Sequence, residues 1–162
     1  MKTAVVFYSL EGSTKEAAKL VAQRCGAQIF ELEEIKKRKG KLLLFMAGGF
    51  GAMTGKRSRL KYNPAEQMGE YRTIYIGSPI WASRTVPAVN TFVNRLNPAG
   101  KQIVFFTVQA DPNPASSKGL QKLIVQLEKR GAAVGRVIQL HGAAPGKTAS
   151  PPYLQEQLDK LL

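Results

Sequence analysis

Residues 3–14 read Thr-Ala-Val-Val-Phe-Tyr-Ser-Leu-Glu-Gly-Ser-Thr, and this stretch decides the fold. Its first half, residues 3–8, is a run of apolar, β-branched and aromatic residues, which predicts a strand. Its second half consists mainly of small and hydroxyl residues, and a helix is predicted to follow over residues 14–24. A strand that passes through a short loop into a helix is the first part of a βαβ unit. The stretch therefore predicts an α/β protein.

Strand-like and helix-like segments alternate along the rest of the chain. Further strands are predicted at residues 28–32, 72–76, 102–107 and 133–140, and further helices at residues 42–54, 87–96, 116–130 and after Pro152. Ser116 or Ser117 can cap the third of these helices, and Ser150 followed by Pro151 can begin the last. Right-handed crossovers between such strands produce a parallel sheet covered on both faces. We expect a doubly wound sheet of five parallel strands.

Residues 35–64 interrupt this pattern, because four glycines between residues 48 and 55 each weaken a helix by roughly 1 kcal/mol relative to alanine. The segment is also strongly basic. Nine of the 24 Lys and Arg residues lie between Lys36 and Lys61, without any Asp or Glu, in a chain of net charge +13. Such a local positive field indicates either a solvated surface or a site for an acidic partner, nucleic acid or phosphorylated ligand.

Composition limits the class of protein. A chain of 162 residues, 44% of them hydrophobic, can bury one full core, and we expect a single domain over residues 1–162 with a basic, glycine-containing excursion at about 35–64. The longest apolar stretch, residues 42–53, is too short for a membrane span of about 20 residues. The single cysteine, Cys25, excludes an internal disulfide and is expected to be a buried, inert thiol. We expect a cytoplasmic protein without a membrane span.

Three segments follow predicted strands at the positions where open α/β sheets bind ligands. In the first, Ser9, Gly12, Ser13 and Thr14 bring hydroxyl and backbone N–H groups to the start of a helix, which suits a phosphate. Ser13 with Glu16 also forms a capping-box pattern, which would stabilise the helix without a ligand. Phosphate binding is favoured only when the other two segments are counted.

The second and third segments follow the third and fourth predicted strands. Residues 77–83 contain Trp81, the only tryptophan, which can stack on a flat ligand or serve as ordinary packing. Residues 108–114 offer backbone amides with Gln109 and Asp111, although an Asp-Pro turn explains them equally well.

The order of these segments resembles the flavodoxin family, in particular its short-chain flavodoxin-like FMN-binding proteins, from Lys2 to about Leu140. Residues 5–9 with residues 12–14 are similar to the family's Ser/Thr-x-Thr-Gly-x-Thr phosphate loop. Residues 77–81 with Pro87 and Thr91-Phe92 are similar to its second flavin loop and the helix that follows. The resemblance implies a flavodoxin-like three-layer sandwich with strand order 2-1-3-4-5, and FMN as the cofactor.

The resemblance also implies a set of cofactor-binding residues and no catalytic or metal-ligating ones. The phosphate would lie on the first segment, the flavin ring on residues 78–82 with Trp81 stacked on it, and the far edge of the ring near residues 108–111. The full set is Ser9, Leu10, Glu11, Gly12, Ser13, Thr14, Ser78, Pro79, Ile80, Trp81, Ala82, Val108, Gln109, Ala110 and Asp111. Glu11 departs from the family's pattern, which has threonine there. Its carboxylate must point outward or meet Lys15 to avoid repelling a phosphate.

Several other motifs fail on spacing. Residues 142–148 are one residue too short between their glycines for a P-loop and are expected to form a turn. Residues 49–54 have Thr54 where a dinucleotide fingerprint needs its last glycine. A receiver domain needs carboxylates where Ser9 and Ser78 stand. His141 is the only histidine, so neither a metal cluster nor a histidine-based triad is expected around it.

Three functions remain compatible with the sequence, and the first is preferred. An electron carrier would bind and orient the flavin for a redox partner protein, expected to be acidic because the chain is basic, and the positive charge would raise the flavin's redox potential. An NAD(P)H-dependent quinone, FMN or nitro-compound reductase would cover the flavin with the basic segment, so whether the protein is an enzyme stays open. A flavin-free module binding nucleic acid or acidic protein lacks any recognised nucleic-acid motif.

Overall fold

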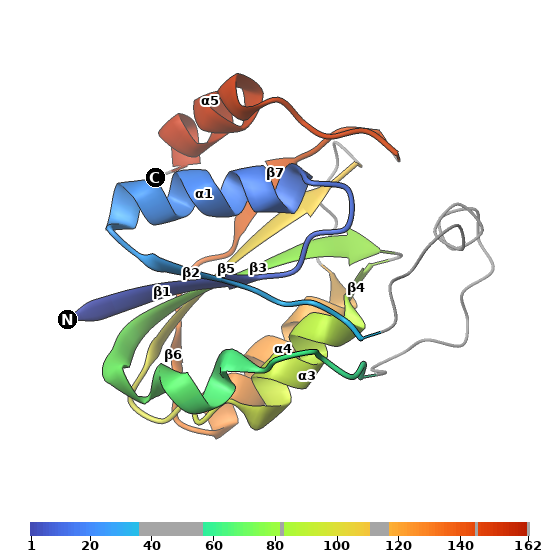
Figure 1. The fold of residues 1–162 in the computed structure, drawn as a ribbon. Coiled ribbons are helices and arrows are strands. Elements are labelled where there is room, and N and C mark those ends of the chain that lie inside the picture. The colour runs from blue at the N-terminus through green and yellow to red at the C-terminus, as the bar shows by residue number, and fades with distance from the viewer. Residues whose placement is uncertain (36–56, 82, 111–116, 145, 162) are drawn as a thin grey trace.

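The computed structural model describes residues 1–35, 57–81, 83–110, 117–144 and 146–161, and within them a mostly parallel sheet lies between two layers of helices (Figure 1). Strand β1 (Lys2–Phe7) pairs with β2 (Gln28–Glu31) on one side and with β3 (Tyr71–Trp81) on the other. Beyond β3 lie β5 (Gln102–Gln109) and β6 (Ala133–Val134). The order β2-β1-β3-β5-β6 confirms the doubly wound α/β sheet. It corresponds to the expected order 2-1-3-4-5, because the short strand β4 (Arg84–Thr85) lies off this path and takes up one number.

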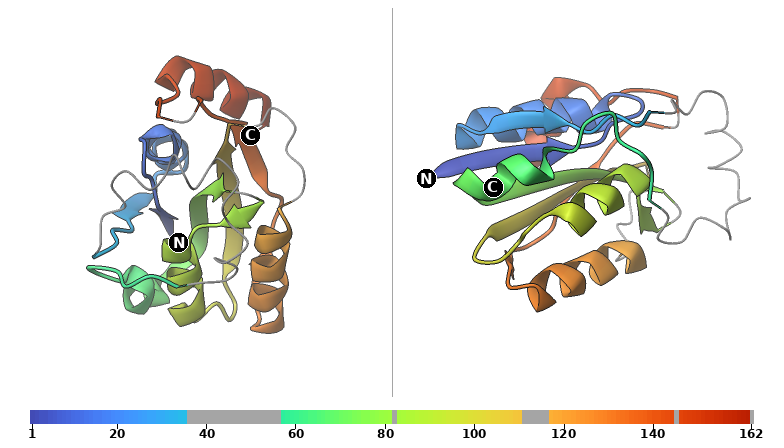
Figure 2. Two further views of the ribbon diagram at one scale, coloured as in Figure 1. Left: turned by 90° about the vertical axis from the view of Figure 1, so that its right-hand side faces the viewer. Right: turned by 60° about the horizontal axis from the view of Figure 1, so that its bottom comes forward.

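Helices cover both faces of the sheet, as the two views of Figure 2 show. One face is covered by α1 (Ser13–Cys25) and α5 (Pro151–Leu161), and the other by α3 (Pro87–Arg95), α4 (Lys118–Lys129) and the 3-10 helix η1 (Pro64–Glu70). Ser117 caps α4 as predicted, because its Oγ accepts a hydrogen bond from the N–H of Leu120 at 3.1 Å. The helix predicted over residues 42–54, and most of the basic excursion, lie outside the described residues.

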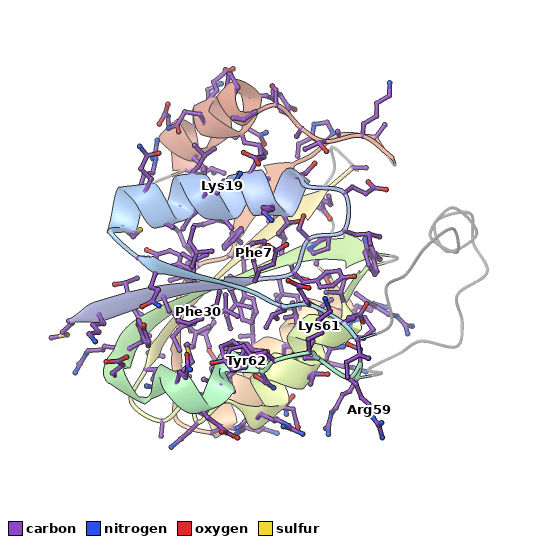
Figure 3. The ribbon with its side chains drawn as sticks, viewed as in Figure 1. Phe7, Lys19, Phe30, Arg59, Lys61 and Tyr62 are labelled. Atoms are coloured by element: carbon purple, nitrogen blue, oxygen red, sulfur yellow. The ribbon has the colours of Figure 1, made fainter. Side chains whose placement is uncertain are left out.

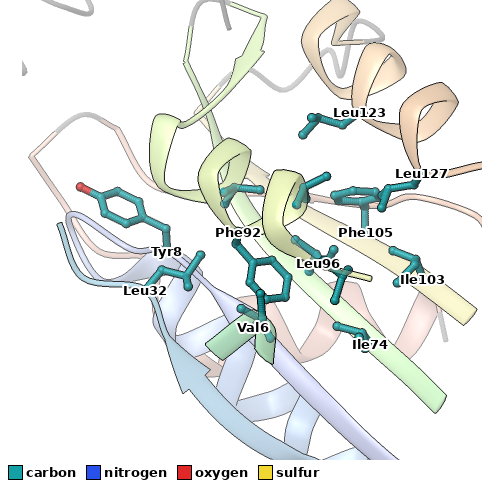
Figure 4. Close-up of a cluster of buried hydrophobic side chains, with 14 of the residues drawn as sticks. Val6, Tyr8, Leu32, Ile74, Phe92, Leu96, Ile103, Phe105, Leu123 and Leu127 are labelled. Carbon is teal, nitrogen blue, oxygen red and sulfur yellow. The ribbon is translucent and has the colours of Figure 1, made fainter. Parts of the chain in front are cut away.

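Strand β1 explains the three layers, because its successive side chains point to opposite faces. Ala4 and Val6 belong to the cluster beneath α3 and α4, which Figure 4 shows around Val6 and Phe105. Val5 and Phe7 belong to the second cluster, and Figure 3 shows Phe7 on the side of β1 that faces α1. Both faces of the strand are buried, as a near-continuous apolar sequence requires.

The fifth predicted strand, residues 133–140, is divided into β6 and β7 (Ile138–His141). Strand β6 pairs with the beginning of β5 and β7 with its end, and between them the pairing shifts by one residue. The N–H of Gly135 still donates to the C=O of Ile103 at 2.8 Å, after which the chain leaves the ladder. Glycine has no side chain to pack and favours such a break. The shift brings His141 beside Gln109 at the end of β5.

Strands β3 and β5 continue past their predicted ends at Ile76 and Thr107. They stay paired as far as Pro79 and Val108, and β3 then forms an antiparallel hairpin with β4 (Arg84–Thr85). The second and third expected loops therefore begin as strand, which fixes the backbone of the residues that they contain.

Helix η1 is an element that the sequence analysis missed. Its start matches ordinary helix signals, because the Oδ1 of Asn63 accepts from the N–H of Ala65 at 3.0 Å and Pro64 takes the first position. At its other end the Nζ of Lys101 donates to the C=O of Met68 at 2.7 Å. Burial lowers the pKa of Lys101. This basic residue thus stabilises the end of a helix.

Gly77 is the most tightly packed glycine of the sheet. A Cβ there would lie 2.2 Å from Cζ of Phe106, the residue paired with it on β5, whose ring is fully buried. We expect Gly77→Ala to lower the free energy of unfolding by about 1–3 kcal/mol, because a ring in a packed core has to move. Urea denaturation measures this loss.

Gly69→Ala is the matched control, because a Cβ at Gly69 has no atom within 4 Å. Its effect should stay within about 0.5 kcal/mol. Combining Gly77→Ala with Phe106→Leu should restore part of the stability, since the two positions share one contact. Equal stability of Gly77→Ala and the wild type would show that the contact at Phe106 is not limiting.

Candidate functional site

The three segments singled out in the sequence meet in one pocket at the carboxyl edge of the sheet. The pocket is lined by Ser9, Leu10, Glu11, Ser13, Thr14, Pro79, Ile80, Trp81, Val108, Gln109, Ala110, Gly142 and Ala143. Most of the expected cofactor-binding residues are in this set. Gly12 and Ser78 do not line the pocket, and Ala82 and Asp111 lie outside the described residues.

The first segment turns sharply into α1 at Gly12. Gly12 has a φ of 105°, in the left-handed region that favours glycine, and its C=O accepts the N–H of Glu16 at 2.9 Å. Its N–H donates to the Oγ of Ser9 at 3.1 Å. The N–H groups in the first turn of a helix have no acceptor within the helix, and the helix dipole makes that end positive. The start of α1 therefore suits an anion.

The capping box considered as an alternative for Ser13 and Glu16 does not form. The helix cap is Gly12, without a side-chain hydrogen bond, because Ser13 already belongs to the helix. The Oγ of Ser13 instead accepts from the N–H of Ala149 at 2.8 Å, and Glu16 pairs with Lys19 at 2.8 Å. The alternative explanation of this sequence as a self-sufficient cap is thereby removed.

Glu11 has partners that the sequence did not indicate. Its Oε1 accepts from the N–H of Gly146 at 2.8 Å, and its C=O accepts from the hydroxyl of Thr148. Lys15, the partner considered for it, pairs with Glu31 at 2.7 Å, and the Glu31 carboxylate raises the pKa of the Lys15 amine. The Glu11 carboxylate is thus engaged by a backbone N–H from the C-terminal part of the chain.

The second segment supplies an aromatic wall. Trp81 is half-buried and meets Tyr8 edge to face, with ring centroids 6.1 Å apart at an angle of 84°. The hydroxyl of Tyr8 donates to the buried carboxylate of Glu34 at 3.1 Å, which fixes the Tyr8 ring from its far end. Ser78 is buried and its Oγ donates to the C=O of Pro79 at 2.8 Å, so its hydroxyl serves the backbone.

The C-terminal part of the chain forms a fourth wall, which the sequence analysis missed. Gly142 and Ala143 line the pocket directly after β7, and the N–H of Gly142 donates to the C=O of Gln109 at 2.7 Å. Residue 145 of the predicted turn lies outside the described residues, and on either side of it the N–H of Lys147 donates to the C=O of Ala144 at 3.0 Å. The sequence did contain a signal for this wall. Gly142 and Ala143 closely follow the last predicted strand, and parallel strands all end at the same edge of the sheet.

The described residues also bear on metal-binding and membrane-spanning proteins. Within the described ranges no three His, Cys, Asp or Glu side chains lie close enough together to hold a metal ion. Of the helices in those ranges, none is both long and apolar enough to cross a bilayer.

Glu11→Ala should release the turn that Glu11 holds. The N–H of Gly146 loses its acceptor, so we expect its amide hydrogen to exchange about three- to tenfold faster, the equivalent of one partly exposed hydrogen bond. Hydrogen exchange followed by NMR measures this rate in the absence of any ligand.

Glu11→Gln is the matched variant, because its amide oxygen can accept the same hydrogen bond without the charge. Exchange at Gly146 should then stay near the wild-type rate. If both variants exchange like the wild type, the contact between Glu11 and Gly146 does not hold the turn.

Comparisons with known proteins agree with this geometry. A family model described as flavodoxin matches residues 2–131. Among solved structures, a protein from Bacteroides uniformis described as a flavoprotein is 26% identical, with a TM-score of 0.71 over 98% of this chain and 97% of its own. Oxidised flavodoxin 1 from Bacillus cereus is 17% identical, with a TM-score of 0.60 over 99% of this chain and 94% of its own.

A third solved structure is a flavoprotein in complex with FMN from Lactobacillus acidophilus. It is 17% identical, with a TM-score of 0.54 over 86% of this chain and 91% of its own. No curated protein matches the chain. Because the family model covers most of the sequence, from β1 through α4, the chain belongs to the flavodoxin family.

Proposed function

We propose that this chain binds FMN in the pocket and acts as an electron carrier for a redox partner protein. One observation carries the proposal: a helix N-terminus suited to a phosphate and an aromatic wall suited to a flat ring lie in the same pocket, at the ends of β1 and β3. The FMN complex of the Lactobacillus acidophilus relative supports the same cofactor.

The chemistry of the lining fits both ends of FMN. Hydroxyls of Ser9 and Thr14, with backbone N–H groups at the start of α1, are donors for the phosphate. Trp81 and Ile80 offer apolar surface to the ring, and Gln109 is a polar group near its edge. When bound, FMN supplies the redox chemistry by taking up and releasing electrons. The protein binds the cofactor, orients it and excludes water from one face.

The charge distribution supports an acidic partner. Six acidic residues of the described ranges pair with basic ones: Glu16, Glu31, Glu33, Glu70, Glu156 and Asp159. The remaining basic side chains set the surface charge. One of them is Arg59, which points away from the sheet (Figure 3). The N–H of Ile35 donates to the C=O of Arg59 at 2.9 Å. This bond holds the Arg59 backbone just beyond the carboxyl end of β2, at the edge of the sheet where the pocket lies.

A reductase that oxidises NAD(P)H directly is the second candidate, and it shares the pocket. We also propose a cytoplasmic location, because the chain has a single cysteine and so no internal disulfide. Cys25 itself is half-buried and not buried as predicted.

Binding of FMN and of riboflavin separates the two ends of the site. Trp81→Ala should weaken both ligands about ten- to hundredfold, because both lose the stacked ring. Ser9→Ala should weaken FMN alone, because riboflavin lacks the phosphate. Quenching of flavin fluorescence on titration measures both constants.

Trp81→Phe is the control, since it keeps a flat ring and should lose less affinity than Trp81→Ala. If absorbance shows that the wild-type protein takes up neither flavin, the proposal is overturned. Equal losses of FMN and riboflavin in Ser9→Ala would place the phosphate elsewhere.

Electron transfer to small oxidants tests the carrier role. Reduced FMN-loaded protein should react faster with anionic ferricyanide than a variant with Arg57 and Arg59 changed to Gln, and the difference should shrink as salt is added. The same protein should oxidise NAD(P)H only when a separate reductase is present. Sustained NAD(P)H oxidation with a quinone by the protein alone would favour the reductase.

A further inference from the structure

His141, at the end of β7, is held by two side chains of α5. The side-chain amide of Gln157 bonds its backbone twice, accepting from the His141 N–H at 2.8 Å and donating to its C=O at 2.9 Å. The Nδ1 of the ring lies 2.7 Å from the hydroxyl of Tyr153. Gln157 and Tyr153 are four residues apart and therefore share one face of the helix.

The ring of His141 reaches from α5 to the pocket. Its Nε2 lies 2.9 Å from the C=O of Ala110, which lines the pocket. A carbonyl only accepts hydrogen bonds, so Nε2 carries a proton and donates to it. Both ring nitrogens thus have a partner, and the third segment is tied to α5 at Ala110.

The residues after His141 also hold the first segment, which leads into α1. Gly146 donates to Glu11 and Ala149 donates to Ser13, both at 2.8 Å. The end of β7 and the residues after it therefore contact the first and third segments, through His141, Gly146 and Ala149, although they lie beyond residues 2–131 that match the family model.

We propose that His141 is a positioning residue for the flavin site: by holding the Ala110 carbonyl it fixes the pocket edge and couples ligand binding to the docking of α5. The inference rests on the proposed binding of FMN. A segment that must be ordered on binding costs affinity, and a segment already held in place does not. By linkage, FMN should also stabilise the docking of α5 by the same factor.

Three variants separate this role from simple packing. His141→Phe keeps an aromatic ring and removes both ring hydrogen bonds, so FMN affinity should fall about tenfold, as for one lost hydrogen bond. His141→Gln keeps an N–H donor for Ala110 and should recover affinity to within about threefold of the wild type. Gln155→Ala is the matched control on α5, because the Gln155 side chain donates to Asp159 of the same helix; it should leave FMN affinity nearly unchanged.

Hydrogen exchange of the apo protein provides a readout that does not need the cofactor. Peptides covering residues 105–110 should exchange faster in His141→Phe than in the wild type, and at the wild-type rate in His141→Gln. If the wild type binds no FMN, the proposed function fails while this measurement still tests the contact with Ala110.

Two outcomes would overturn the inference. If His141→Phe keeps the FMN affinity and the hydrogen-exchange rate of the wild type, the hydrogen bond from His141 does not position Ala110. A loss of affinity in His141→Gln as large as that in His141→Phe would show that an N–H donor to Ala110 does not restore the site, which contradicts the role of this hydrogen bond. Thermal melts of all variants identify any that fail to fold.

Discussion

Parallel backbone pairing of β1, β3 and β5 is the constraint on which the rest of the structure depends. Parallel strands place all their carboxyl ends at one edge, and pairing that continues to Pro79 and Val108 brings the segments after them into contact. The pairing is close because Gly77 leaves room for the ring of Phe106. A pocket formed by residues from distant parts of the sequence follows directly from this geometry.

Electrostatics at the pocket follow from the same arrangement. The helix dipole makes the start of α1 positive. The one carboxylate in the first segment, that of Glu11, accepts a hydrogen bond from the N–H of Gly146. A negative ligand group therefore meets backbone donors and hydroxyls. The basic side chains divide into those used within the fold, such as Lys101 at the end of η1, and exposed ones such as Arg59, which are available to a partner.

The agreement between sequence and structure differs with the range of the interaction. The helices beginning at Ser13, Pro87 and Pro151 are each predicted to within a few residues, because caps, prolines and apolar spacing act locally. The ends of β3 and β5 are not, because the last residues of a strand pair only if a neighbour runs alongside them. The break before β7 is a similar case, since Gly135 alone does not reveal where pairing resumes.

The sequence by itself determined the α/β class, the strand order through its family resemblance, and the segments containing Ser13, Trp81 and Gln109 that line the pocket. The α/β class and these segments depend on patterns within about 15 residues, which local conformational preferences express directly. Only the tertiary structure decided that Ser13 bonds Ala149 instead of capping its helix, that Glu11 faces Gly146, and that residues after β7 complete the pocket. These contacts join residues more than 100 positions apart, and such partners meet only when the sheet has brought the strand ends together.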